Sequence, residues 1–381
     1  MMLGVIATHF LTVIIFILLL SVLVLIHEFG HFFVAKRLGI KVEEFGFGFP
    51  PRAFGKKIGE TIYSINYLPF GGFVKLYGED EAGAGRITLP GKTKSADTNL
   101  NKAFFSRPTW QKALVVVAGV IMNYLLAVVI FSYLAQAQGI ATEGNSIIVA
   151  QVEKNSPAQD AGIKIGDKII KVNDQNMANI SQLISFTKSH EGQEISVTIQ
   201  RNNTLQVINL TPRTKVGKNQ GAMGVALSPD VKIIKYSGLS AIKKGISQTF
   251  ELVSLTLTGL KVAIAQALHL QFPQGVAGPF GIVRLTGVAQ QYGPFAVLTL
   301  AGALSLTLAI FNIFPIPALD GGRLFFILLD GVLYLVFRKK LSSKIEGYIN
   351  PIAFAILIGL ILLISYHDIV SWASGQPLLP Q

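Results

Sequence analysis

The chain has 381 residues, of which 51% are hydrophobic and 14% charged, and its formal net charge is +12. This composition excludes a string of ordinary soluble domains and indicates a membrane protein. In such a protein Lys and Arg mark cytoplasmic loops and the lipid headgroup zone, so the positive charge does not predict a nucleic-acid partner and none is expected. Because there is no cysteine, disulfides, thiolate nucleophiles and cysteine-bound metals are excluded, and any metal must be held by the six histidines or by Asp and Glu.

Four apolar runs are candidates for crossing a hydrocarbon core of about 30 Å. They cover residues 3–26, 113–135, 295–314 and 352–365. The last run is short, and we expect its flanks to extend it. The sequence therefore predicts a polytopic α-helical membrane protein with four transmembrane helices.

Two other apolar stretches are interpreted differently. Residues 245–270 mix Gln, Glu, Lys and His into the apolar pattern, which is typical of an amphipathic helix on the outer membrane surface. Residues 324–337 contain Asp330 and are too short to span, so we expect a helix that dips into the inner leaflet.

Lys and Arg near the ends of the spans indicate the orientation. The first and third connections between spans carry these residues, as at Lys36, Arg37, Arg107 and Arg338, whereas residues 138–153 have none. Since basic loops stay in the cytoplasm, both termini and the loop between the second and third spans are predicted to lie outside it.

That second loop has the composition of a soluble domain at residues 146–212. Strand and helix patterns alternate within it, which predicts a small α+β module. The strands are expected at residues 147–152, 168–172, 195–200 and 206–210, and the helices at residues 157–161 and 180–188.

The first span ends in the motif His27-Glu28-Phe29-Gly30-His31. Positions i and i+4 of a helix share a face, so both imidazoles can reach one Zn²⁺ while Glu28 can take a proton from water bound to the metal. Chance would produce H-E-x-x-H only about 0.003 times in a chain of this composition. Three ionisable residues at membrane depth also require a reason, which a metal supplies.

Two imidazoles do not complete a catalytic zinc site, which usually has three protein ligands. Asp320 is the best candidate because the prolines and glycines around it, in residues 312–322, break the third helix and let the backbone turn at the cytoplasmic side. Asp330, Glu346 and Asp368 are the weaker alternatives.

Residues 61–68 alternate like a strand, and residues 69–74 continue with turn residues and an apolar run. With residues 45–50 they predict a β element in the first connection, for which an ordinary cytoplasmic hairpin is the alternative. The polar, glycine-rich residues 79–102 are interpreted as a linker.

These motifs together resemble the site-2 protease family of intramembrane zinc metalloproteases, in particular its bacterial members of the RseP and RasP type. The resemblance rests on H-E-x-x-H in the first span, on N-x-x-P-x-P-x-L-D-G ending the third, and on G-x-x-x-N-x-x-x-A at Gly119, Asn123 and Ala127. Val120 departs from the family, which usually has proline there.

The resemblance implies a role for each motif residue. His27, His31 and Asp320 would hold Zn²⁺, and Glu28 would activate water for attack on a peptide carbonyl. Asn123 and Asn312 would hold substrate or stabilise charge on its carbonyl oxygen, the alternative for each being an interhelical hydrogen bond. The β element would be membrane-associated, and its exposed edge could pair with a substrate helix that has unwound.

The module resembles the PDZ domains attached to bacterial proteases, on the strength of Asn155-Ser156-Pro157-Ala158, Ala161-Gly162-Ile163 and residues 166–173. Such domains commonly bind peptides by adding a strand to a sheet edge, whereas others act only as steric filters. Related proteases often carry two such modules and this chain has one. Whether the PDZ-like domain binds peptide or excludes bulk is left open.

The implied protein is a protease of the bacterial inner membrane, with its active site in the cytoplasmic half of the bilayer. Its substrates would be single-span proteins such as anti-sigma factors or signal-peptide remnants, cut after another protease has shortened their outer domain. The alternative is a non-enzymatic membrane PDZ adaptor with a structural zinc. The expected division is residues 1–136 with the first two spans and the β element, 145–213 with the PDZ-like domain, 240–294 with the amphipathic surface segment, and 295–381 with the last two spans.

Overall fold

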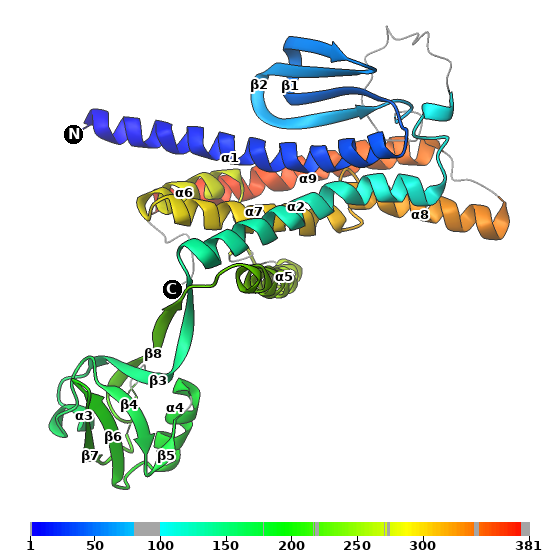
Figure 1. Cartoon of the computed structure of the whole chain (residues 1–381). Coiled ribbons are helices and arrows are strands. Elements are labelled where there is room, and N and C mark those ends of the chain that lie inside the picture. The colour runs from blue at the N-terminus through cyan, green and yellow to red at the C-terminus, as the bar shows by residue number, and fades with distance from the viewer. Residues whose placement is uncertain are drawn as a thin grey trace. The chain divides into compact units, whose positions relative to one another are not determined.

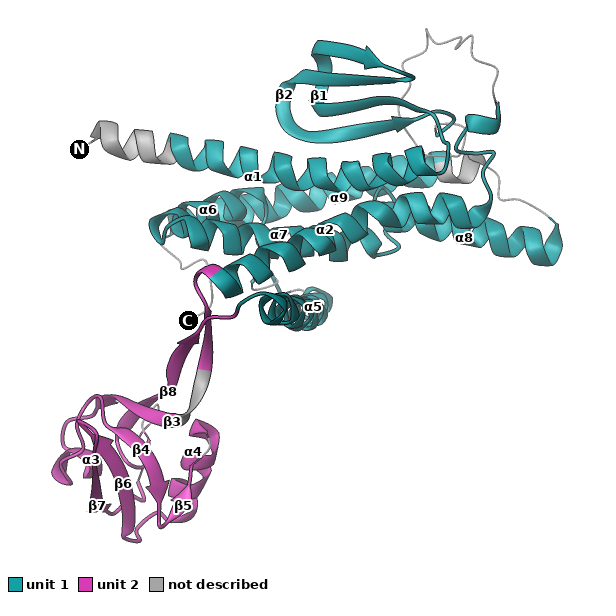
Figure 2. Ribbon diagram, viewed as in Figure 1, with its two compact units in different colours: residues 1–136, 237–381 teal, residues 137–236 magenta. Residues whose placement is uncertain are grey.

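The structure, a computed structural model, describes residues 2–79, 100–177, 179–215, 217, 221–269, 271–272, 275–338 and 343–374. The chain divides into two compact units, of which the first comprises Met1–Gln136 and Ser237–Gln381 and the second Ala137–Tyr236 (Figure 2). Most of the predicted linker at residues 79–102 lies outside the described residues.

The first unit is mainly helical and carries one small sheet (Figure 1). Its elements are α1 (Met2–Arg37), β1 (Val42–Ile58), β2 (Thr61–Leu76), the 3₁₀ turn η2 (Leu100–Lys102), α2 (Thr109–Ala137), α5 (Leu239–Leu268), α6 (Pro279–Gln291), α7 (Pro294–Ile313), α8 (Asp320–Phe337) and α9 (Ser343–Ala373).

Among the described residues, five helices are long and apolar enough to cross a membrane. They are Phe10–Arg37, Thr109–Ala137, Leu239–Leu268, Pro294–Ile313 and Gly347–Ala373. Four of these contain or overlap the predicted spans. The fifth is α5, which the sequence predicts to lie on the surface, so the count of exactly four spans is not confirmed.

Helices α1 and α2 pack closely because small residues lie where they meet. A Cβ atom added to Gly30 would lie 2.4 Å from the carbonyl oxygen of Ala118, a distance at which atoms clash. Glycine therefore lets the two backbones approach. The contact lies one residue before His31, and it brings the histidine motif against α2.

The sheet of β1 and β2 has four segments because both long strands bend back. Register pairs place them side by side in the order 72–76, 42–49, 61–66 and 52–58. Segment 72–76 pairs on one side only within the described residues. Ser21 of α1 holds the chain just before it, since its Oγ donates to the carbonyl of Pro69 and accepts from the N–H of Gly71.

The second unit is an antiparallel sheet with two helices. Its elements are β3 (Ile140–Val152), α3 (Pro157–Asp160), β4 (Lys168–Val172), β5 (Gln175–Asn176), α4 (Ile180–Ser189), β6 (Ile195–Arg201), β7 (Thr204–Leu210) and β8 (Val225–Ile234). The main strands lie in the order β7-β6-β4-β3-β8, with β5 beside β4. All four predicted strands and both predicted helices of the module are confirmed.

Strand β8 lies beyond the predicted module. Pro229 lies inside it, and proline in a run of residues argues against a strand because it cannot donate to the ladder. The structure places β8 at the edge of the sheet, paired with β3 alone among the described strands. Proline is tolerated at such an edge, which explains why the sequence pattern missed this strand.

Candidate metal centre

Three potential metal ligands converge between α1 and the start of α8. His27 and His31 are each 7% exposed, and their Nε2 atoms lie 3.2 Å apart. Oδ2 of Asp320 lies 2.7 Å from Nε2 of His27 and 3.2 Å from Nε2 of His31. In the part of the chain that the structure describes, these three residues form a group able to hold a metal ion.

The spacing and donor types fit zinc. Ligands about 2.0–2.1 Å from a tetrahedral Zn²⁺ lie roughly 3.3 Å from one another, close to the observed separations, and two imidazoles with one carboxylate form a known catalytic set. Nδ1 of His31 lies 2.8 Å from the carbonyl oxygen of Val115. A carbonyl can only accept, so the ring proton sits on Nδ1 and the lone pair on Nε2 points at the other two ligands.

The loop before α8 brings Asp320 to the histidines. Cβ atoms on Gly321 and Gly322 would lie 2.0 Å and 2.4 Å from the carbonyl oxygens of Phe314 and Ile316. The two glycines therefore permit α8 to begin directly against the backbone of the proline-containing loop, as their sequence context suggested, through close approach rather than an unusual turn.

Glu28 lies beside the three ligands. Its Oε2 accepts a hydrogen bond of 3.0 Å from the backbone N–H of Val74, on the outer edge of the sheet segment 72–76. With His27 and Asp320 it borders a cavity of about 210 Å³, which is also lined by Val24, Asn123, Leu308, Asn312, Ala318 and Leu319.

The two predicted asparagines differ in their surroundings. Asn123 is fully buried, and its amide nitrogen lies 3.3 Å from Nδ1 of His27. Asn312, near the end of α7, lines the cavity and is partly exposed. The structure thus brings both asparagines to the metal trio, one against a histidine and one facing the cavity.

The weaker candidates for third ligand are placed elsewhere. Asp368 accepts hydrogen bonds from the N–H groups of Gly278 and Gly281, at 2.8 and 3.0 Å, and so caps the start of α6. Asp330 is not part of the metal trio, and the side chain of Glu346 lies outside the described residues.

One ion pair at the site carried no sequence signal. Nη1 of Arg323 donates to Oε1 of Glu79 at 2.5 Å, and the guanidinium lies 4.6 Å from the ring centroid of Phe104. Arg323 stands one helical turn after Asp320. Glu79 follows the sheet segment that contacts Glu28, but it belongs to no recognisable motif and could not have been singled out.

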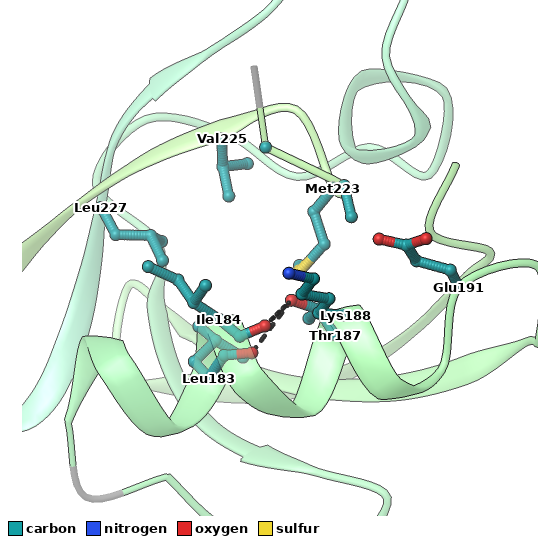
Figure 3. Close-up of a pocket in the computed structure, with 10 residues that line it drawn as sticks. Leu183, Ile184, Thr187, Lys188, Glu191, Met223, Val225 and Leu227 are labelled. Atoms are coloured by element: carbon teal, nitrogen blue, oxygen red, sulfur yellow. Dashed lines mark hydrogen bonds between the residues drawn. The ribbon is translucent and has the colours of Figure 1, made fainter. Parts of the chain in front are cut away.

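The second unit has its own groove, between α4 and β8 (Figure 3). Its volume is about 300 Å³, and one side is formed by α4 while the other is formed by β8 and the residues before it. The lining residues are Leu183, Ile184, Thr187, Lys188, Glu191, Gly221, Ala222, Met223, Val225 and Leu227. The groove is therefore largely apolar and follows a sheet edge.

Two histidines one helical turn apart, a converging carboxylate and an adjacent glutamate, set among apolar helices, define the class of membrane-embedded metalloproteases. The sequence profile of peptidase family M50 matches residues 15–360. The chain belongs to this family, that of the site-2 proteases.

Curated relatives match over almost the whole chain. Regulator of sigma-W protease RasP from Bacillus subtilis is 29% identical over 94% of this chain and 98% of its own length. Zinc metalloprotease RasP from Geobacillus kaustophilus is 29% identical over 94% and 97%. A Clostridium perfringens protein with the provisional name of zinc metalloprotease is 35% identical over 93% and 97%.

Among solved structures, the PDZ domain of an SdrC-like protein from Listeria monocytogenes matches 23% of this chain and 93% of its own, with 15% identity and a TM-score of 0.20.

The protein is accordingly an intramembrane zinc metalloprotease, a multi-pass membrane enzyme whose substrates are membrane proteins. The alternative of a non-enzymatic adaptor with a structural zinc is set aside, since the family and the named relatives are proteases.

Proposed function

We propose that His27, His31 and Asp320 hold the zinc ion and that Glu28 is the general base. The observation that carries this assignment is the convergence of the two Nε2 atoms and Oδ2 of Asp320 within 3.2 Å of one another. When bound, zinc acts as a Lewis acid that polarises the scissile carbonyl and makes water more acidic.

Glu28 moves the proton in this proposal. The hydrogen bond from the N–H of Val74 holds Oε2 in place, so Oε1 is the atom that accepts a proton from the attacking water. As this proton moves, the water oxygen forms a bond to the carbon of the peptide carbonyl. Glu28 then returns that proton to the amide nitrogen as the C–N bond breaks. Asn312 lies on the cavity wall, where its amide N–H can donate to the substrate carbonyl oxygen.

The substrate meets the enzyme as an extended strand. A transmembrane helix hides its carbonyls in its own hydrogen bonds and must unwind before attack. Segment 72–76 offers a sheet edge next to Glu28, and Ser21 holds the preceding residues against the interior of the candidate span Phe10–Arg37. These contacts support a β element at membrane depth that pairs with the unwound substrate.

The enzyme lies in the bacterial inner membrane with four spans, and α5 rests on the outer surface. The distribution of Lys and Arg supports this topology, in which both termini and Ala137–Tyr236 are extracytoplasmic and the metal site is in the cytoplasmic half. A fifth span at α5 would put the basic connection between α1 and α2 and the basic connection between α7 and α9 on opposite sides of the membrane.

Its substrates are single-span proteins, such as anti-sigma factors or signal-peptide remnants, whose outer domain another protease has shortened. Unit Ala137–Tyr236 enforces that order, either as a steric filter or by capturing the shortened end in the groove beside β8. Its insertion between α2 and α5, on the outer side in this topology, supports both mechanisms.

The activity is tested by co-expressing the protein with a panel of tagged single-span proteins and following fragments by immunoblot. Wild type should cleave a shortened member of the panel, and Glu28→Gln should retain zinc but not cleave, because an amide cannot accept the proton. Cleavage by Glu28→Gln near the wild-type rate would remove Glu28 from the mechanism.

Two variants separate the roles of the second unit. Replacing residues 137–236 with a flexible linker should admit a full-length substrate if the unit is a filter. Ile184→Glu, a charge on the exposed wall of the groove, leaves the bulk unchanged and should impair cleavage only if the groove captures substrate. If the deletion protein is folded and zinc-loaded but cleaves neither form, the filter mechanism is wrong.

A further inference from the structure

Helix α2 presents one stripe of residues to the histidine motif. Val115, Gly119 and Asn123 are four residues apart, so they lie one above another on a single helix face. The carbonyl oxygen of Val115 contacts His31, Asn123 contacts His27, and a Cβ on Gly119 would lie within 2.8 Å of both imidazoles. Each ring nitrogen that points away from the metal trio therefore faces a polar atom of α2.

The amide of Asn123 can present either of its polar atoms to His27, because a turn of the amide exchanges Oδ1 and Nδ2. With Nδ2 toward Nδ1 of His27 at 3.3 Å, the buried Oδ1 atom has no hydrogen-bond partner within the described residues. Turning the amide by 180° about its last side-chain bond places Oδ1 against Nδ1. The oxygen then accepts a hydrogen bond from the ring N–H, and Nδ2 takes the position that Oδ1 had occupied.

This orientation also fixes the tautomer of His27. If Nδ1 were an acceptor, the ring proton would sit on Nε2 and point at His31 and Asp320, where a metal ligand needs a lone pair. With Oδ1 of Asn123 accepting from Nδ1–H, Nε2 is the free nitrogen. The same arrangement is already present at His31, whose Nδ1 faces the carbonyl of Val115.

We propose that Asn123 is a positioning residue that holds the tautomer and ring plane of His27, and that it does not touch substrate. The proposal rests on the zinc-binding role of His27 proposed above. Asn123 belongs to the cavity wall but has no exposed surface of its own, and Ser305 of α7 fixes its backbone by donating from Oγ to its carbonyl oxygen at 2.8 Å. The partly exposed Asn312 is left as the asparagine that can reach a substrate.

The test measures zinc affinity of the purified full-length protein by competition with a chelator. Asn123→Leu keeps the number and branching of the side-chain heavy atoms but removes the acceptor, and should weaken zinc binding about 10- to 100-fold, the usual effect of losing such a partner. Asn123→Asp keeps an acceptor and should restore affinity to within a few fold of wild type. Asn312→Leu, the same change in the same cavity, should leave zinc affinity unchanged.

The proposal would be overturned if Asn123→Leu kept the wild-type zinc affinity but had a lower kcat/KM. Asn123 would then be assigned to substrate binding instead. Equal losses of zinc in Asn123→Leu and Asn312→Leu would also overturn it, since cavity polarity alone would then explain the effect. Should the leucine variant not accumulate, Asn123→Ala asks the same question, with the Tm of the metal-free protein as the folding control.

His27→Ala distinguishes a failure of the positioning role of Asn123 from a failure of the proposed zinc-ligand role of His27. If His27→Ala binds zinc as the wild type does, the ligand assignment itself is wrong. If His27→Ala loses zinc and Asn123→Leu does not, only the positioning role fails.

Discussion

The backbone N–H of Val74 donates a hydrogen bond of 3.0 Å to Oε2 of Glu28, which ties the proposed base on α1 to the edge of the β1–β2 sheet. Val74 pairs with Phe45 across the opposite side of its strand. The donor that orients Glu28 therefore belongs to the same edge that we propose for substrate pairing, so the position of the base depends on this strand.

Val74→Pro tests that dependence, because proline removes the N–H group and is tolerated on a sheet edge. A hydrogen bond to a charged group contributes about 1.5–3 kcal/mol, so kcat/KM should fall about 10- to 100-fold with zinc content unchanged. Val74→Ala is the matched control, since it shortens the side chain and keeps the donor. Equal losses in the two variants would show that packing, not the hydrogen bond, matters at this position.

The Glu79–Arg323 pair should stabilise the start of α8 and with it Asp320. Arg323→Met keeps the apolar stem but leaves the largely buried Glu79 without this cation, so both Tm and zinc retention should fall. Because a lone buried charge costs more than a neutral pair, the double variant Glu79→Gln/Arg323→Met should be more stable than Arg323→Met alone. If the loss of Tm in the double variant equals the sum of the losses in Glu79→Gln and Arg323→Met, the two residues do not act as a pair.

The metal trio was accessible from sequence because its residues lie in compact motifs. The i, i+4 spacing places two imidazoles on one helix face wherever the helix lies, and the prolines and glycines around Asp320 force a break at a span end. The structure brings these residues together, and their roles stay predictions. The contacts of Asn123, Val74 and Arg323 instead depend on packing between elements far apart in the chain, which no local pattern encodes.

The fold, like the site, could be predicted where the signal is local in the sequence and not where it depends on contacts between distant elements. Spans and the module's strands were predicted where the hydropathy or alternation was continuous. Helix α6 was not predicted separately within residues 240–294, and its start is held by Asp368, which lies 90 and 87 residues along the chain from the glycines that it caps. The count of spans stayed open because α5 combines the length of a span with the polar residues of a surface helix.

Asp167 should make the second unit sensitive to acid. Burial raises the pKa of this carboxyl, but hydrogen bonds from Arg201 and from the backbone N–H of Lys164 outweigh burial and hold the pKa below its ordinary value. The carboxylate therefore contributes its full stabilisation above its unfolded pKa of about 3.9, and the contribution declines below that value as pH falls through the lower pKa of the folded state. Hydrogen exchange of the full chain should show β4 and β6 losing protection below about pH 4. Asp167→Asn should remove this step; an unchanged step would assign it to another group.

Gly119→Ala should displace both histidines at once. The added Cβ would lie 2.4 Å from Nε2 of His31 and 2.8 Å from Cε1 of His27, and neither ring can retreat far because both are buried. We expect loss of most bound zinc and at least a 100-fold drop in kcat/KM, about 2.7 kcal/mol or more. Gly259→Ala on α5 is the control, since its Cβ would meet nothing within 4 Å and alanine favours a helix by up to about 1 kcal/mol. Measuring zinc content by mass spectrometry together with Tm separates a loss of zinc binding from a loss of fold stability. A Gly119→Ala protein that keeps its zinc would mean that α1 and α2 can part at the metal site, and that this face of α2 does not hold the imidazoles in place.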